Sequence, residues 1–171
     1  MYEWACTQLE KFSYTQYEIS NWARTCADGR LLACRHNLQY WRNQPYLGVG
    51  AGAHGYAAGT RTANVLGPAQ YIQRCLNGAP KQFPLTPATV NAHPVDKQSE
   101  MMETMMVGMR LTEEGVADVR FRERFGVGIE EAFPGEVERL LKRGLVEWHG
   151  DALRLTRTGI MFGNHVFMEF V

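Results

Sequence analysis

The stretch YLGVGAGAHGY, residues 46–56, indicates a buried strand that breaks into alternating glycines around a histidine. Residues 46–51 are largely small and apolar on both faces of this strand, which is typical of a parallel sheet covered on both sides. Glycines there let the backbone approach a ligand or turn tightly. Because ligands bind at the carboxyl ends of parallel strands, Gly50, Gly52 and His54 are candidates for a pocket wall. Tight packing without a ligand is the alternative, since alternating glycines alone are a weak signal.

A second strand is predicted over residues 16–20, within QYEISNWAR (16–24), and it ends in polar side chains, with a long polar loop containing Asp28-Gly29 after Ser20. Apolar residues recur at helical spacing over residues 2–9, so an amphipathic helix is expected just before this strand. A helix followed at once by a strand is half of a βαβ unit. The polar residues Glu18, Ser20 and Asn21 then either face the same pocket as the glycines or simply end the strand.

The rest of the chain divides by composition. A proline begins a short helix predicted over residues 68–76. Residues 79–96 contain several prolines and little periodicity, so they read as a linker or extended connection. We therefore predict three parts: the last strands and helices of an incomplete (β/α) barrel over residues 1–78, the linker, and a separate domain over residues 97–171.

The part from residue 97 onward has the pattern of a winged helix. A methionine-rich helix starts near Ser99, a plausible N-cap, and helices are predicted over residues 117–125 and 133–143. The segment LLKRGLVEWHGDALRLTRTG, residues 140–159, then predicts a hairpin turning at Gly150-Asp151 and a threonine-capped closing helix. The methionines at this first helix are either core or an adaptable partner surface, and core is the commoner use. They are Met101, Met102, Met105, Met106 and Met109.

Charge and cysteine usage exclude several classes of protein. Lysine plus arginine number 18 and so do aspartate plus glutamate, which argues against bulk attraction to nucleic acid or an anionic membrane. Glutamates offset Arg139, Lys142 and Arg143 on the predicted third helix, where a winged helix would read DNA. None of the four cysteines forms a CxxC pair. No apolar run is long enough for a membrane span, and no signal peptide is evident, so a cytoplasmic location is expected.

Four segments together carry a family resemblance. They are YEISNWAR (17–24), HNLQYW (36–41), YLGVGAGAH (46–54) and GLVEW…LRLTRTG (144–159). In this order they resemble the oxygen-independent coproporphyrinogen III oxidase-like radical SAM proteins. The HNxxYW pattern is similar to the branch regarded as haem chaperones, the HemW-like proteins. The resemblance covers essentially the whole chain and corresponds to the C-terminal part of the family.

The resemblance implies S-adenosylmethionine (SAM) and a [4Fe–4S] cluster as cofactors of the full-length parent. The family's CxxxCxxC motif and its glycine-rich SAM motif have no counterpart here. We therefore expect this chain to hold no cluster and to be inactive alone, without catalytic residues. The cysteines present have other spacings and are Cys6, Cys26, Cys34 and Cys75.

The resemblance also implies roles for two of the motifs. His36 becomes a candidate axial haem ligand in a polar loop, oriented by Asn37, with Tyr40 and Trp41 offering flat surfaces to the macrocycle. The alternative is a loop histidine bonded to backbone, with the aromatic rings in the core. Gly50, Gly52 and His54 become the wall of the SAM pocket.

Three functions follow. The chain represents a haem chaperone-like protein, or an oxygen-independent coproporphyrinogen III oxidase that decarboxylates its substrate oxidatively, or a winged-helix DNA-binding module. The HNxxYW pattern favours the haem chaperone-like protein. The charge distribution does not favour the DNA-binding module, which would need a basic recognition helix. Expected partners are haem or a porphyrin and a haem-accepting protein, with no nucleic acid. Uncovered barrel strands are expected to promote self-association.

Overall fold

The computed structural model describes residues 1–171 and separates into two compact units. One unit combines residues 1–43 with residues 101–171, and the other comprises residues 44–100. These boundaries differ from the predicted division at residues 78 and 96. Each unit is described by itself. None of the helices is both long enough and apolar enough to cross a lipid bilayer.

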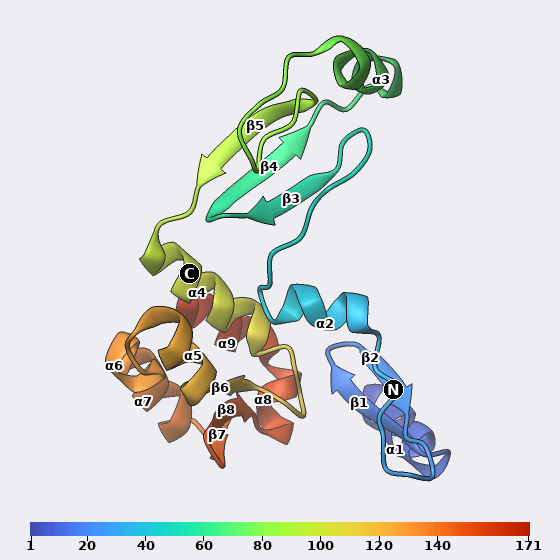
Figure 1. The fold of residues 1–171 in the computed structure, drawn as a ribbon. Coiled ribbons are helices and arrows are strands. Elements are labelled where there is room, and N and C mark those ends of the chain that lie inside the picture. The colour runs from blue at the N-terminus through green and yellow to red at the C-terminus, as the bar shows by residue number, and fades with distance from the viewer. The chain divides into compact units, whose positions relative to one another are not determined.

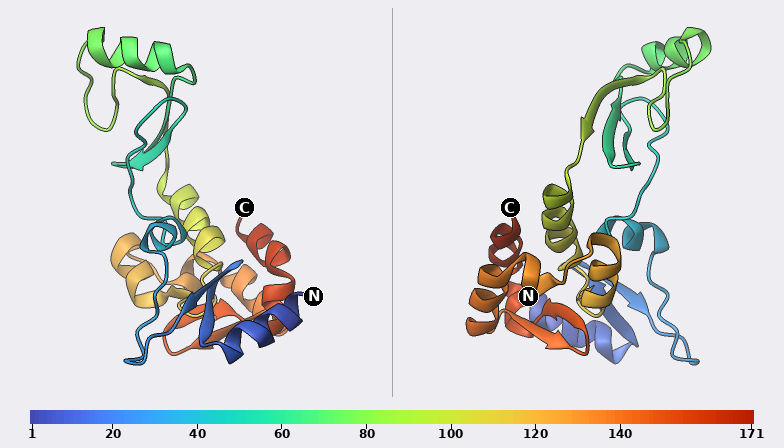
Figure 2. Two further views of the ribbon diagram at one scale, coloured as in Figure 1. Left: turned by 90° about the vertical axis from the view of Figure 1, so that its right-hand side faces the viewer. Right: turned by 60° about the vertical axis from the view of Figure 1, so that its left-hand side comes forward.

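The first unit begins with a helix and a hairpin. Helix α1 (Tyr2–Lys11) packs along strand β1 (Tyr14–Glu18), as the two views in Figure 2 show. Strand β1 pairs antiparallel with β2 (Asn21–Arg24), a segment that the sequence pattern had assigned to a polar loop. The helix and first strand are confirmed, but the expected βαβ half-unit is wrong, because the turn at residues 19–20 returns the chain at once to its neighbour.

A short helix follows where a mixed or loop segment was expected. Helix α2 (Arg35–Trp41) contains the whole HNLQYW motif. Its residues include no glycine or proline that would interrupt a helix. Placing His36 in a flexible loop was therefore wrong.

The second unit is built on an antiparallel sheet of order β3-β4-β5 (Figure 1). Its strands are β3 (His54–Ala57), β4 (Thr60–Asn64) and β5 (Thr89–Pro94). Helix α3 (Pro68–Asn77), correctly predicted, follows β4 and lies beyond the end of the sheet where β4 ends and β5 begins. Strand β5 lies within the predicted linker 79–96 and ends in the proline Pro94, which suits an edge strand.

The predicted parallel strand over residues 46–51 is wrong. This segment is extended but forms only a single antiparallel bridge, between Tyr46 and Tyr56. Leu47 and Val49 are 65% and 84% exposed, so the segment is not covered on both sides. An apolar run was read as a buried strand because composition alone cannot show which face a neighbouring layer covers.

Residues 101–171 form the winged-helix-like part of the first unit, as predicted. Helix α4 (Lys97–Gly108) enters it, and strand β6 (Val116–Ala117) joins a three-stranded antiparallel sheet of order β6-β8-β7. Its hairpin turns at Gly150, as expected, and Gly144 ends the preceding helix with φ +64°. The closing helix is interrupted at Phe162. The remaining elements are α5 (Asp118–Phe125), α6 (Ile129–Ala132), α7 (Pro134–Lys142), β7 (Val146–His149), β8 (Ala152–Leu155), α8 (Arg157–Met161), α9 (Gly163–Phe167) and the 3₁₀ turn η1 (Met168–Phe170).

The methionine stripe of α4 is core. Met105 and Met109 are fully buried, and the other three methionines pack against the same apolar cluster. Asp96, rather than Ser99, caps the helix: its carboxylate accepts from the Ser99 backbone N–H at 2.9 Å and from the Ser99 hydroxyl at 2.8 Å. These two hydrogen bonds, the backbone one first, hold the pKa of Asp96 below its usual value.

A core substitution tests this packing. Leu140 of α7 is 0% exposed, whereas Leu32 is 52% exposed. Leu140→Ala should lower the free energy of unfolding by about 2–5 kcal/mol, because it removes buried apolar surface and leaves a cavity. Leu32→Ala, the matched control in the same unit, should change it by less than about 1 kcal/mol. Urea denaturation followed by circular dichroism measures both, and equal losses would contradict the assigned core.

Candidate functional site

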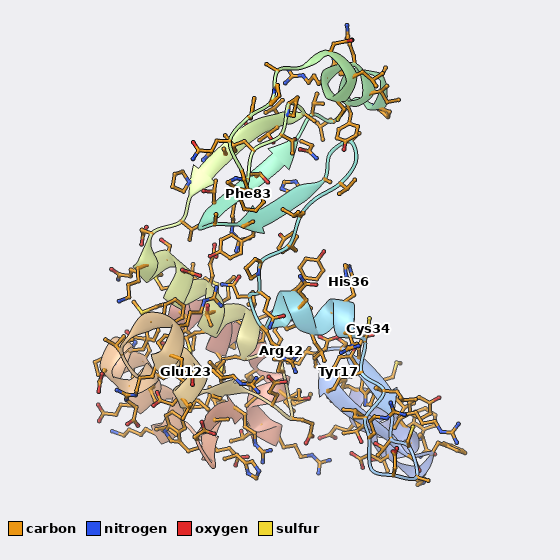
Figure 3. All side chains as sticks on the ribbon, in the orientation of Figure 1. Tyr17, Cys34, His36, Arg42, Phe83 and Glu123 are labelled. Carbon is orange, nitrogen blue, oxygen red and sulfur yellow. The ribbon has the colours of Figure 1, made fainter.

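Helix α2 presents two faces with different characters. Residues four apart lie about 40° apart around a helix, so His36 shares one face with Tyr40, and Asn37 shares the other with Trp41. The rings of His36 and Tyr40 meet edge to face, with centroids 4.9 Å apart and planes at 88°. His36 is exposed, and Figure 3 shows it and Tyr17 on opposite sides of α2.

The other face of α2 packs into the first unit. The Asn37 side-chain amide donates to the Tyr17 hydroxyl at 3.3 Å. The guanidinium of Arg110 lies over the Trp41 ring, 4.6 Å from its centroid. Asn37 and Trp41 are thus engaged with the protein, and the four residues expected to surround haem do not form one surface. The structure brings together His36 and Tyr40 only.

The C-terminal end of α2 is anchored by ion pairs and hydrogen bonds. Arg42 donates from Nε and Nη2 to the two carboxylate oxygens of Glu114, at 3.0 and 2.6 Å for the closest contacts. Arg120 adds a third contact to Glu114 at 2.9 Å. A bidentate guanidinium–carboxylate pair fixes direction as well as distance. The helix therefore has a defined orientation on the winged-helix part.

Asn43 completes this anchor. It has φ +47°, the left-handed conformation that asparagine tolerates after a helix end. Its buried side-chain amide donates to the Thr104 hydroxyl at 3.1 Å, and its carbonyl oxygen accepts from Arg124 at 2.9 Å. His36 thus projects from a helix whose far end is held at three positions.

The polar end of strand β1 is folded inward. Glu18 is fully buried, and the Asn21 side-chain amide donates to its Oε1, while Oε2 has no hydrogen-bond partner. Ser20 is exposed. A buried carboxylate with an unsatisfied oxygen lowers stability. Glu18 is therefore not an ordinary polar residue at the exposed end of a strand. Whether Glu18, Ser20 and Asn21 share a pocket with the glycines stays a prediction, because the two groups lie in different units.

The glycine segment of the second unit has a packing explanation. A Cβ on Gly48 would lie 2.2 Å from the His54 carbonyl oxygen, and Gly50 and Gly52 have φ of +111° and +69°. The Gly50 N–H donates to the Tyr71 hydroxyl at 3.1 Å, and Gly52 N–H to the Val65 carbonyl at 2.9 Å. Their backbone donors are therefore used within the unit.

His54 occupies a different place from the one expected. It is exposed and begins strand β3, whereas the sequence pattern put it after a strand. The backbone of His54 lies close to the glycine segment, because the Gly48 backbone passes directly beside the His54 carbonyl group. The role of Gly50, Gly52 and His54 as a SAM pocket wall stays a prediction.

The cysteines do not form a metal site. All four are free, with Cys34 and Cys75 exposed. Nowhere do three or more histidine, cysteine or acidic side chains gather in a way that could hold a metal ion. The residues of this chain therefore do not fit a [4Fe–4S] cluster, which needs several thiolates at one place.

The arginines of α7 are paired with acids. Arg139 contacts Glu169 at 3.0 Å and Glu136 at 3.2 Å, and Arg143 contacts Glu169 at 3.4 Å. Hydrogen bonds to Glu169 and then Glu136 raise the pKa of Arg139. These pairs support the interpretation of α7 as a solvated face that neutralises its own charge.

The sequence reasoning missed the residues that anchor α2. Asn43, two residues after Trp41, carried a local signal, since asparagine commonly follows a helix end. Arg42, Glu114 and Arg110 carried none, because their partners lie roughly 70 or more residues away in the chain.

The anchor can be tested by a double-mutant cycle. Arg42→Ala and Glu114→Ala should each destabilise the chain, with a coupling of about 0.5–1 kcal/mol because the pair is bidentate and half buried. The control is the pair Arg30–Asp28, which is 3.9 Å apart with side chains 72% and 65% exposed. Its coupling should be close to zero. Thermal unfolding measures both cycles, and equal couplings would show that Arg42 does not anchor the helix.

Comparison with known proteins assigns the chain to a family. Residues 95–162 match the HemN C-terminal domain model. The chain is 38% identical over 171 residues to the protein named heme chaperone HemW from Bacillus subtilis, which covers 100% of the chain and 42% of that protein. It is 33% identical over 168 residues to heme chaperone HemW from Mycobacterium tuberculosis, covering 96% of the chain and 37% of the relative.

A solved structure supports the fold. Coproporphyrinogen III oxidase (HemN) from Escherichia coli, described as a radical SAM enzyme, superposes with a TM-score of 0.66 at 13% identity. The match covers 98% of this chain and 39% of that one. The chain thus spans about two fifths of the length of the relatives it matches. From its motifs, its winged-helix part and these matches, the chain belongs to the coproporphyrinogen III oxidase-like radical SAM family, in its HemW-like branch.

Proposed function

We propose that this chain is part of a radical SAM haem chaperone-like protein and that helix α2 presents a haem ligand. The observation that carries the proposal is the exposed His36 imidazole, set edge to face against Tyr40 on an anchored helix. An imidazole is a common axial ligand of haem iron. An aromatic ring beside the imidazole suits a flat apolar macrocycle.

We propose different roles for the residues of the motif. His36 would bind the iron, and Tyr40 would contact the macrocycle. Asn37 and Trp41 would hold the helix through Tyr17 and Arg110 rather than touch haem. The proposed haem-accepting protein would then approach the exposed face of α2.

The runner-up is an oxygen-independent coproporphyrinogen III oxidase. The fold resembles that of HemN, which is consistent with this function. At 13% identity, however, a likeness of fold is no argument for a shared activity. The HNxxYW motif and the 38% identity to a protein named heme chaperone support the first proposal. For either function, we propose that SAM and a [4Fe–4S] cluster belong to the full-length parent and that Gly50, Gly52 and His54 border SAM there.

Replacing the proposed ligand is the direct test. In the full-length parent, His36→Ala should weaken haem binding by roughly tenfold or more, about 1.4 kcal/mol, and should move the Soret band. Haem titration followed by absorbance measures both, and the iron content of the cluster should not change. His149→Ala, an exposed histidine of strand β7, is the matched control. Identical affinities and spectra for the wild type and His36→Ala would show that His36 is structural.

The cofactor assignment has its own test. Anaerobic iron–sulfur reconstitution of this chain should yield no stable [4Fe–4S] cluster, because its cysteines do not gather at one place. A protein that carries a CxxxCxxC motif, reconstituted in parallel, is the positive control. Stoichiometric iron and sulfide in the chain, with visible absorbance that SAM perturbs, would contradict the expectation.

A further inference from the structure

Arg110 lies between two aromatic rings in the first unit. Its guanidinium is 4.6 Å from the centroid of Trp41 on α2 and 5.4 Å from that of Phe167 on α9. Nη2 donates to the carbonyl oxygen of Ile19 at 2.7 Å. The two rings and this bond fix the plane of the guanidinium, as cation–π contacts do.

The charge of Arg110 has no carboxylate partner. No aspartate or glutamate forms an ion pair with it, and its buried Nε–H has no acceptor. Glu18, the acid closest to Ile19 in sequence, bonds Asn21 instead. Arg110 is half-buried, and a buried N–H such as its Nε–H normally has an acceptor. An oriented guanidinium that lacks both is suited to receive an anion.

An open pocket adjoins this guanidinium. It has a volume of about 320 Å³ and is lined by Arg110, by Ile19, by residues 160–165 and by Phe167, which belong to α8, α9 and their junction. No acidic side chain lines it. Phe162 and Phe167 give it an apolar wall, while Asn164 and His165 are exposed polar residues of the lining. Gly163 keeps the wall close, since a Cβ there would lie 3.1 Å from the Phe167 ring and 3.4 Å from Ile19.

We infer that this pocket binds a carboxylate that carries an apolar group, with Arg110 as its anion-binding residue. The volume is at the lower end of the range for small-molecule sites, which suits a small aryl or alkyl carboxylate and not a whole tetrapyrrole. The site is separate from the proposed haem face, because Trp41 lies about 140° around α2 from His36. The carboxylate can come from a free organic acid or from a propionate arm of a porphyrin.

The test follows the Arg110 Nε–H signal in ¹⁵N-resolved NMR of the chain. The signal is assigned by its disappearance in Arg110→Lys. Titration with 3-phenylpropionate should shift it in a saturable manner, whereas the neutral 3-phenylpropionamide, of the same shape, should not. Arg110→Gln should weaken 3-phenylpropionate binding by about tenfold or more, as expected for a lost charge-assisted hydrogen bond. Arg157→Gln, an exposed arginine outside this pocket, should leave binding unchanged.

Two further arms complete the test. Protoporphyrin IX and its dimethyl ester, titrated into His36→Ala, distinguish the sources: a shift with the free acid but not the ester identifies a propionate arm, and a shift with 3-phenylpropionate alone identifies a free acid. If Arg110→Gln unfolds, Arg110→Lys should still prefer the acid to the amide, because it keeps the charge. Equal affinities for acid and amide would overturn the inference. The inference would also be overturned if the chemical shift of the Arg110 Nε–H does not change with any added carboxylate but differs in the Glu18→Gln variant. That result would show that Glu18 neutralises Arg110.

Discussion

The first unit depends on the contacts of one residue, Arg110. Its backbone carbonyl accepts from the Ile19 N–H at 3.0 Å, and its side chain donates back to the Ile19 carbonyl at 2.7 Å. Its guanidinium stacks between Trp41 and Phe167. One side chain thus joins the end of β1, the end of α2 and helix α9, which are far apart in sequence. Strand β1 is held further by Thr112, whose N–H and hydroxyl donate to carbonyl oxygens of β1.

This joint explains how a short helix can present a defined surface. A seven-residue helix is too short to be stable by itself in water. Helix α2 gains most of its stabilising contacts at its C-terminal end, through Trp41, Arg42 and Asn43, and one more where Asn37 donates to the Tyr17 hydroxyl. At the N-terminal end, His36 and Cys34 lie exposed at the surface (Figure 3). Rigid support at one end and exposure at the other is the arrangement expected of a helix that positions a ligand-binding side chain.

The winged-helix part supports helix α2. Its core of α4, α5, α7 and the β6-β8-β7 sheet is closely packed around Met105, Met109 and Leu140. The arginines of α7, which would face phosphates in a DNA-binding protein, are paired with Glu136 and Glu169. Glu114, between α4 and β6, instead reaches the helix that carries His36 through Arg42. Through this contact the winged-helix part acts as a platform for α2.

The sequence by itself determined the helices and hairpin of residues 97–171, the methionine core, the two helices α1 and α3, and the family. Those features rest on local periodicity, on Gly144 and Gly150, and on motifs that are contiguous in the chain. It failed over residues 46–51, where a predicted parallel strand forms only one antiparallel bridge, and over residues 16–20, where the expected βαβ half-unit is an antiparallel hairpin. Only the tertiary structure separated His36 and Tyr40 from Asn37 and Trp41, because the side a helix buries depends on its partners. Arg110 and Glu114 could not be found from sequence for the same reason: the groups they contact, Ile19 and Arg42, come together only when the chain folds.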